Sequence, residues 1–173
     1  MQHLLLLTLF SSFWLAPNGI SETPIDTWNN VHIYEGGDGT AHYSDSGYRY
    51  GLKWQCVEFV KRYYASHLDH EMPNTWGHAI SFFDKSLEDG EWNKARGLVQ
   101  YTNGSATSPA VDDLLILDWA EPYGHVAIVG EVTETQILVI QQNAGPTRIY
   151  LDLDRSDGKY TISDQVVGWL RKE

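Results

Sequence analysis

The chain has 173 residues and a mass of 19.7 kDa, the size of one domain that can bury a core without disulfides. Its 12 Lys and Arg against 23 Asp and Glu give a net charge of -11, which excludes nucleic acid and anionic lipid as partners because the summed field repels phosphates. The single cysteine, Cys56, excludes an intramolecular disulfide framework and multi-thiolate metal sites, and we expect no metal or other cofactor.

The first twenty residues differ in composition from the rest of the chain. Residues 4–16 are apolar, too short to cross a bilayer as a helix but typical of the core of a signal peptide. We therefore expect residues 1–20 to be a signal peptide or an N-terminal segment packed on the domain, and residues 21–173 to form a single domain. No second apolar run follows, so we do not expect an integral membrane protein. A signal peptide would send the protein to the periplasm or outside the cell; without one it would be cytoplasmic.

The body of the chain opens with a predicted strand at residues 31–34 and a glycine-rich stretch of loops. A helix is predicted from Trp54 to about Leu68, because apolar side chains recur there at spacings of three and four residues. Glu58 and Arg62, four residues apart on this helix, are expected to form an exposed ion pair. A second helix is predicted at about 77–87 and a shorter helical piece at 92–96.

After residue 111 the pattern changes from helical to extended. Short runs rich in β-branched and aromatic residues, separated by turn residues, predict strands at 114–119, 126–132, 136–141, 147–153, 160–162 and 166–170. Helices followed by strands indicate an α+β fold with an antiparallel sheet, and a helix packed across one face of that sheet.

Cys56 lies in the first turn of the predicted helix. Unpaired backbone N–H groups and the positive end of the helix dipole stabilise a thiolate at such a position. The backbone N–H of Cys56 can also donate to a developing oxyanion. These features favour a nucleophilic cysteine of lowered pKa, and the alternative is a small hydrophobic residue of the core.

A nucleophilic thiol requires a base, and His125 is the candidate among seven histidines. It follows Gly124 and opens an apolar strand, so we expect it at a sheet edge where an imidazole can meet a helix terminus. A structural histidine is the alternative. Gln141 and Asn143 share a face at the end of the next strand, so either amide oxygen could accept the imidazole N–H and fix its tautomer.

The segments that carry these residues resemble one known family. They are GLKWQCVEFV around Cys56, GHVAIV around His125 and QQN at 141–143, and together they resemble the CHAP amidohydrolases and peptidases. More narrowly, KWQCVEF at 53–59, NGS at 103–105, LLI at 114–116 and the terminal GW look like the amidase domain of glutathionylspermidine synthetase/amidase. The resemblance implies a papain-like α+β fold of the CHAP and NlpC/P60 type, with N-terminal helices packed on a C-terminal antiparallel sheet. It also implies Cys56 as nucleophile and His125 as general base and acid.

Two positions depart from the amidase pattern. Gln141 stands where the amidase has a glutamate, and a neutral amide can orient an imidazole but cannot stabilise its charged form as a carboxylate does. Lys61 stands where the amidase has an arginine used in substrate binding, and lysine lacks the bidentate fork for a carboxylate. We expect Gln141 to complete the catalytic site, and Asn143, Lys61, Gln55 and Tyr50 to contribute to substrate binding, Tyr50 through its hydroxyl.

The resemblance implies hydrolysis of an amide through an acyl-enzyme thioester on Cys56. The substrate would be a polyamine conjugate such as glutathionylspermidine, since a chain of charge -11 attracts a polyamine cation. The alternative, if the protein is exported, is an amidase or endopeptidase acting on peptidoglycan peptides. A hypothesis of another class is a non-catalytic module that binds a ligand in the same cleft.

Overall fold

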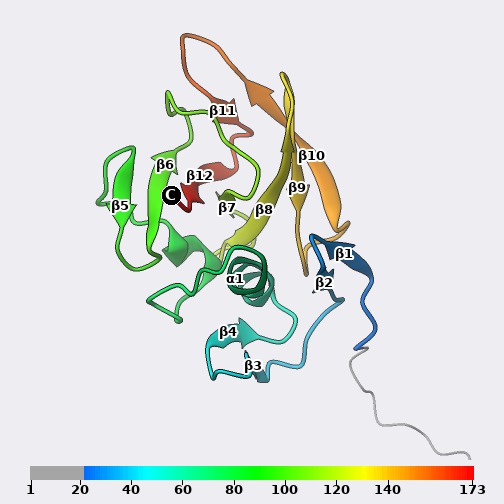
Figure 1. The fold of residues 1–173 in the computed structure, drawn as a ribbon. Coiled ribbons are helices and arrows are strands. Elements are labelled where there is room, and N and C mark those ends of the chain that lie inside the picture. Colours follow the sequence, from blue (N-terminus) through cyan, green and yellow to red (C-terminus); the bar gives the residue numbers. More distant parts are fainter. Residues whose placement is uncertain (1–21) are drawn as a thin grey trace, which may run out of the picture.

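The computed structural model describes residues 22–173, which are mostly β-sheet with one α-helix (Figure 1). The signal peptide or N-terminal segment expected at 1–20 lies outside the described residues. No helix in the described part of the chain is long and apolar enough to cross a membrane.

The elements are short, and all but two of them are strands. In chain order they are β1 (Asp26–Trp28), β2 (Val31–Ile33), β3 (Ala41–Tyr43), β4 (Arg49–Leu52), α1 (Cys56–His67), the 3-10 helix η1 (Ala79–Phe82), β5 (Glu91–Asn93), β6 (Leu98–Thr102), β7 (Leu114–Leu117), β8 (His125–Val132), β9 (Gln136–Ile140), β10 (Arg148–Asp154), β11 (Thr161–Ile162) and β12 (Val166–Arg171).

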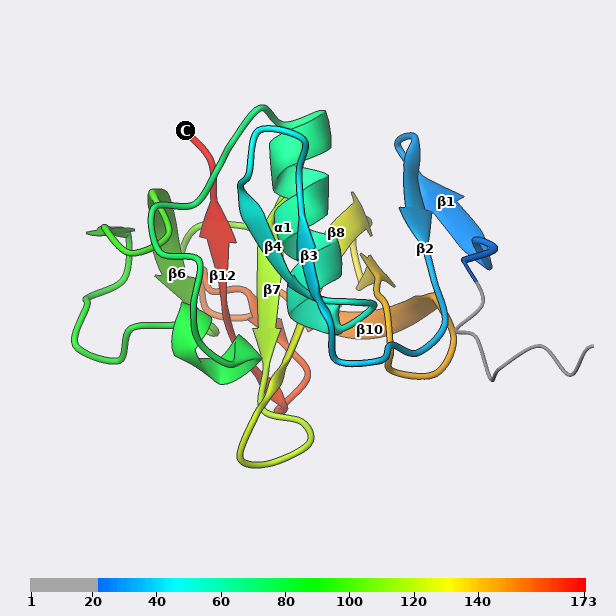
Figure 2. The ribbon, with the colours of Figure 1, turned by 90° about the horizontal axis from the view of Figure 1, so that it is seen from below.

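Eight of these strands form one antiparallel sheet in the order β11-β10-β9-β8-β7-β12-β6-β5. The antiparallel sheet and its six C-terminal strands confirm the prediction from the sequence. The remaining strands form two hairpins, β1–β2 and β3–β4. The β3–β4 hairpin packs on α1, so the chain that precedes the helix lies beside its first turns (Figure 2).

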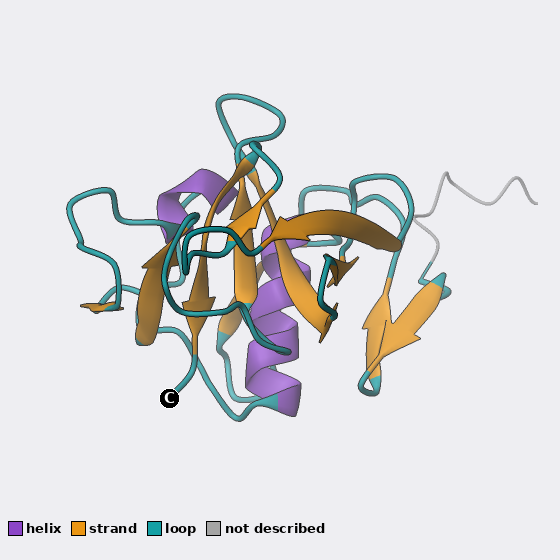
Figure 3. Cartoon of the chain, turned by 90° about the horizontal axis from the view of Figure 1, so that it is seen from above, coloured by secondary structure: helices purple, strands orange, loops and turns teal. Residues whose placement is uncertain are grey.

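Both faces of the central strands are buried. In β7, Leu114 and Ile116 pack into a core under α1, whereas Leu115 and Leu117 pack with Trp169 into a second core on the other face. Figure 3 shows α1 against the strands in the middle of the sheet. Burial on both faces explains why β7 and β8 read as continuous apolar runs rather than as alternating ones.

The second core is enclosed because the sheet curls toward itself. The turn after β6 meets β11: the Asn103 side chain donates to the Ile162 carbonyl and accepts from its N–H, both at 2.8 Å. Ser105 and Tyr160 form an isolated antiparallel bridge beside it. The NGS segment at 103–105 therefore has a structural role in joining the sheet edge to β6.

The prediction of several N-terminal helices is wrong for the described residues, which contain one α-helix. Only Ala79–Phe82 of the second predicted helix is helical, as a single 3-10 turn. The side chain of Asp84 accepts from the backbone and hydroxyl of Ser86, a local turn that competes with helix. The helical piece predicted at 92–96 is instead strand β5 and a tight turn, in which Gly97 has a φ of +67°.

Gly168 provides a test of the packing of β12. A Cβ at this position would lie 2.2 Å from the carbonyl oxygen of Tyr101 and 2.6 Å from the ring of Phe83, so the β12–β6 pairing would have to shift. We predict that Gly168→Ala lowers the free energy of unfolding by about 2 kcal/mol, measured by urea denaturation. Val111→Ala, at a side chain 50% exposed, is the control and should change it little. Equal effects of the two substitutions would contradict this account.

Candidate active site

A pocket of about 780 Å³ opens where the start of α1 meets the start of β8. Cys56 and His125 both line it, with Gln55 and Asn143 from the residues singled out in the sequence. The wall is completed by β4 and by the loops before η1 and β8. Two residues almost seventy positions apart in the chain are thus brought to one cavity.

Cys56 is the first residue of α1, and Gln55 is its N-cap in an extended conformation. Burial raises the pKa of the Cys56 thiol, and hydrogen bonds from the backbone of Val126 and Val57 act in the opposite direction without overcoming it. Val126 directly follows His125 in β8. The sulfur therefore lies against the strand that carries the imidazole.

His125 is the first residue of β8 and is 4% exposed. Its Nε2 lies 3.1 Å from Oε1 of Gln141, and its ring stacks on Trp119 with centroids 5.5 Å apart. Burial lowers the pKa of His125 to about 4, although the Gln141 hydrogen bond raises it.

The orientation of the Gln141 amide fixes the tautomer of His125. The Nε2 of Gln141 donates to the carbonyls of Ala144 and Pro146, both at 2.9 Å, so the amide oxygen of Gln141 must face the imidazole. An oxygen only accepts, and His125 therefore carries its proton on Nε2. This leaves the lone pair on Nδ1 as the basic site of the imidazole.

Desolvation disfavours both charged forms of the pair. At neutral pH the imidazole of His125 is neutral, because its pKa is about 4, and the thiol of Cys56 is protonated, because its pKa is raised. The expectation of a thiolate with a lowered pKa is wrong for this resting pocket. The helix N-terminus stabilises the thiolate by less than burial destabilises it.

We predict that alkylation of Cys56 by iodoacetamide is slow at pH 7 and accelerates as the pH rises above 9, because the thiolate is the reactive form. The chain has one cysteine, so mass spectrometry of the whole protein reports on this thiol alone. A rate already constant between pH 6 and 8 would contradict the prediction, since it would require a thiolate at neutral pH.

The other residues predicted for substrate binding divide into two pairs. Gln55 and Asn143 line the pocket and are joined there, the Asn143 amide donating to the Gln55 side-chain oxygen at 2.7 Å. Tyr50 and Lys61 are buried and do not line it. Lys61 instead donates to the backbone carbonyls of Arg49 and Thr75. The prediction that Lys61 and Tyr50 contact substrate is not supported by these positions.

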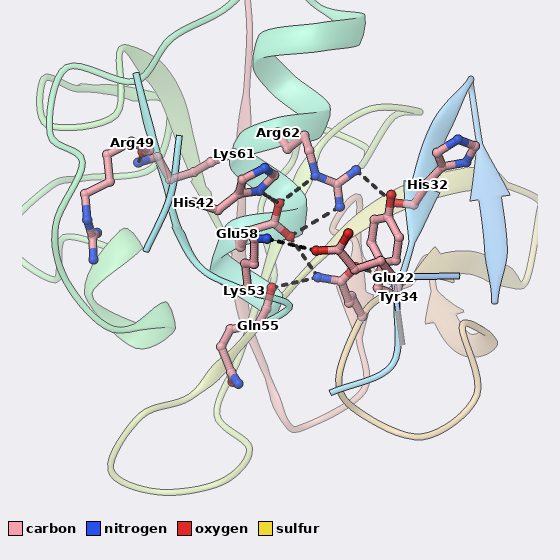
Figure 4. A network of polar contacts seen from close by, with 11 residues as sticks. Glu22, His32, Tyr34, His42, Arg49, Lys53, Gln55, Glu58, Lys61 and Arg62 are labelled. Carbon is pink, nitrogen blue, oxygen red and sulfur yellow. Dashed lines mark hydrogen bonds and ion pairs between the residues drawn. The ribbon is translucent and has the colours of Figure 1, made fainter. Parts of the chain in front are cut away.

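A buried polar network lies behind the pocket at the first turn of α1 (Figure 4). The Glu58 carboxylate is fully buried and receives hydrogen bonds from His42 at 2.8 Å, from Arg62 at 2.6 Å and from Gln142 at 2.9 Å. The expectation that Glu58 and Arg62 form an exposed pair is therefore wrong. Burial opposes ionisation of Glu58, but these hydrogen bonds outweigh it and hold its pKa below the ordinary value.

The network joins four segments of chain. Gln142 also donates to the Gln55 carbonyl at 3.0 Å and accepts from the Tyr34 N–H at 2.9 Å, and Arg62 donates to the His32 carbonyl at 2.8 Å. The start of α1, the end of β2, the β3–β4 hairpin and the turn after β9 are thereby fixed to one carboxylate. The position of Cys56 depends on this carboxylate, because Cys56 begins the same helical turn.

We predict that Glu58→Gln lowers the free energy of unfolding by about 3–5 kcal/mol, because it leaves the Arg62 guanidinium without its buried partner. Urea denaturation measures the effect. Glu134→Gln, at an exposed position in the β8–β9 turn, is the matched control and should be nearly neutral. If both substitutions were neutral, the network would not hold the helix start.

Sequence reasoning missed several residues of the pocket wall. Arg49, Trp76, Trp119 and Tyr123 line it, and so does His78, which was expected inside a helix. These residues come from loops or from a strand too short to predict. The signal available in the sequence was the presence of tryptophans in segments without a regular pattern. The structure leaves one of them, Trp76, 66% exposed.

A family comparison agrees with this geometry. The model of the CHAP domain matches residues 45–143, which include the start of α1, His125 and Gln141. The chain belongs to the CHAP family. Membership of this family and the similarity to the relatives below support a cysteine amidase or peptidase, a hydrolase of amide bonds.

The curated relatives are longer proteins. The chain is 38% identical over 105 residues to glutathionylspermidine synthase of Crithidia fasciculata, a match that covers 55% of this chain and 14% of that protein. It is 27% identical over 145 residues to the bifunctional glutathionylspermidine synthetase/amidase of Escherichia coli (strain K12), covering 74% of this chain and 23% of that protein. The chain thus spans less than a quarter of these relatives. Among solved structures, the wild-type endolysin LysIME-EF1 matches with a TM-score of 0.39 and 17% identity, over 75% of this chain and 56% of that one.

Proposed function

We propose that this CHAP domain, of papain-like type, hydrolyses an amide through Cys56 as nucleophile, His125 as general base and acid, and Gln141 as the residue that orients the imidazole. The observation that carries the proposal is the Gln141 amide, whose fixed orientation leaves Nδ1 of His125 unprotonated in the pocket that Cys56 lines. A structural histidine would not require a basic nitrogen in a residue that lines a cavity.

The first step follows from the neutral state of the pair. Nδ1 of His125 takes the thiol proton as the sulfur attacks the amide carbonyl carbon, and the carbonyl oxygen becomes an oxyanion. The backbone N–H of Cys56 at the helix N-terminus is one donor for this oxygen. Gln55 supplies a second, because it lines the pocket and the bond from Asn143 to its side-chain oxygen leaves its amide nitrogen as the donor.

The second step releases the amine. The C–N bond breaks as the imidazolium returns its proton to the leaving nitrogen, and the acyl group stays on Cys56 as a thioester. A water then gives its proton to Nδ1 and attacks the thioester carbonyl, which releases the acid and restores the thiol. Trp119, stacked on His125, limits the access of bulk water to the imidazole.

Substitutions at Gln141 test the role of this residue. We predict that Gln141→Ala lowers kcat/KM by about 10- to 100-fold, because the tautomer is no longer fixed. Gln141→Glu should raise the pKa of His125 by placing a carboxylate behind the ring, and so move the acid limb of kcat/KM from near pH 4 to higher pH. Cys56→Ala and His125→Ala test the two reacting groups, and each should lower kcat/KM at least about 1,000-fold. Full activity in Cys56→Ala would refute the mechanism.

We propose the amide of a peptide or peptide conjugate as substrate. The names of the relatives favour glutathionylspermidine. The apolar stretch at 4–16 favours a peptidoglycan peptide, because a signal peptide would send the protein to the periplasm or outside the cell. Incubating the protein with glutathionylspermidine and with purified sacculi, with Cys56→Ala as control, separates the two. Turnover of neither would support the hypothesis of a non-catalytic binding module.

A further inference from the structure

One wall of the pocket has no role in the proposed amide hydrolysis. Arg49 in β4 lines the pocket with its guanidinium 4.1 Å from the centre of the Trp76 ring. Its one hydrogen bond within residues 22–173 goes from Nη1 to the carbonyl of Thr75 at 3.3 Å, and its buried Nε has no partner there. A guanidinium has five N–H donors, so most of its capacity is unused.

Two further cations stand behind this wall. Lys61 donates to the carbonyls of Arg49 and Thr75, and Arg96 donates to those of Asn74 and Trp76. No carboxylate of the described chain lies within ion-pair distance of Arg49, Lys61 or Arg96. Three basic side chains without an ion-pair partner are unusual in a chain that carries 23 Asp and Glu.

The proximity of two arginines to Lys61 contributes to the pKa of this lysine. Burial, with Arg49 and Arg96 nearby, lowers the pKa of Lys61 to about 7, and the exposed Glu71 only partly opposes this. Burial lowers the pKa of Arg96 to about 10. Arg49 and Arg96, which both donate to carbonyls of residues 74–76, make the electrostatic potential there positive, and a bound anion would be stabilised.

The rest of the pocket is consistent with a negatively charged ligand. None of the described residues that line it is Asp or Glu, whereas Arg49 contributes a cation. Figure 4 shows the Arg49 guanidinium directed away from the Glu58 network, so that carboxylate does not neutralise it. A polyamine cation would find no acidic partner in this pocket.

We propose that Arg49, packed over the Trp76 ring, binds a carboxylate of the substrate and so determines specificity for peptides that carry a free carboxylate. Arg presents two parallel N–H donors to a carboxylate, and the indole holds its plane. Lys61 and Arg96 act as positioning residues, because they fix the backbone on both sides of this pair. The proposal rests on the proposed function and names the chemistry of its substrate.

Both candidate substrates can carry this group, and each allows a matched pair of probes. Glutathionylspermidine has a free α-carboxylate on its γ-glutamyl residue, and a γ-D-glutamyl muropeptide has one on its D-glutamyl residue. The partner probes replace that carboxylate by a carboxamide. Because the two members of a pair differ in one group, the ratio of their affinities reports on carboxylate recognition alone.

The experiment measures binding of the four probes to Cys56→Ala by calorimetry. We expect at least one acid probe to bind about 10- to 100-fold more tightly than its amide, and Arg49→Gln in the same background to abolish the difference. Arg49→Lys should retain part of it. Arg155→Gln, a matched change at an exposed arginine distant in sequence and not lining the pocket, should leave the ratio unchanged.

The outcomes separate this proposal from the proposed function. If no acid probe binds more tightly than its amide, or if Arg49→Gln leaves the ratio intact, the carboxylate subsite is refuted even when the wild-type protein hydrolyses an amide. If the ratio falls with Arg49→Gln but Cys56→Ala has full activity, the subsite stands and the mechanism fails. A thermal unfolding transition shows that each variant is folded. A substitution that only disturbed the structure would weaken binding of both probes of a pair equally, so the acid-to-amide ratio would not change.

Discussion

The contact between the first turn of α1 and the rest of the fold depends on one buried carboxylate. Glu58 is fully enclosed, and the donors around it come from the β3–β4 hairpin, from α1 itself and from the turn after β9. A charge buried in this way is stable only while its partners are in place. The helix start, and with it Cys56, is thereby held at one position relative to the sheet.

Desolvation determines the chemistry of the site. The same packing that brings Cys56 against β8 removes water from the thiol and the imidazole, and both charged forms become costly. A carboxylate behind the imidazole would offset part of this cost, whereas Gln141 supplies only orientation. The site therefore rests as a neutral pair, and in the proposed mechanism charge separates only as the sulfur attacks.

The sequence predicted the elements whose physical signal is local. The apolar periodicity of α1 and the β-branched runs of β7 to β12 are properties of neighbouring residues. The places of Cys56 and His125 in those elements made them candidates, but burial, which is not local, reverses the expected shift of the thiol pKa. The short strands β3 to β6 lacked such a signal. The second predicted helix is absent because turn-forming hydrogen bonds of Asp84 compete with it.

Long-range contacts were the part that could not be predicted. The burial of Glu58 depends on His42 and Gln142, which are far from it in the chain, so the local i to i+4 spacing with Arg62 suggested only a surface pair. Lys61 likewise appeared at a substrate-binding position, but the fold directs its side chain to backbone carbonyls. The pocket wall formed by Arg49 and Trp76 was missed because these two residues come together only when β4 and the loop before η1 fold against each other.

The turn after β9 holds three consecutive amides with three different destinations. Gln141 reaches the imidazole, Gln142 the buried carboxylate, and Asn143 the side chain at the helix N-cap. Adding or deleting one residue here would misdirect all three side chains at once. Variation in loop length during evolution should therefore be tolerated in the exposed turn between β8 and β9 and be rejected at this one, although both are short connections of the same sheet.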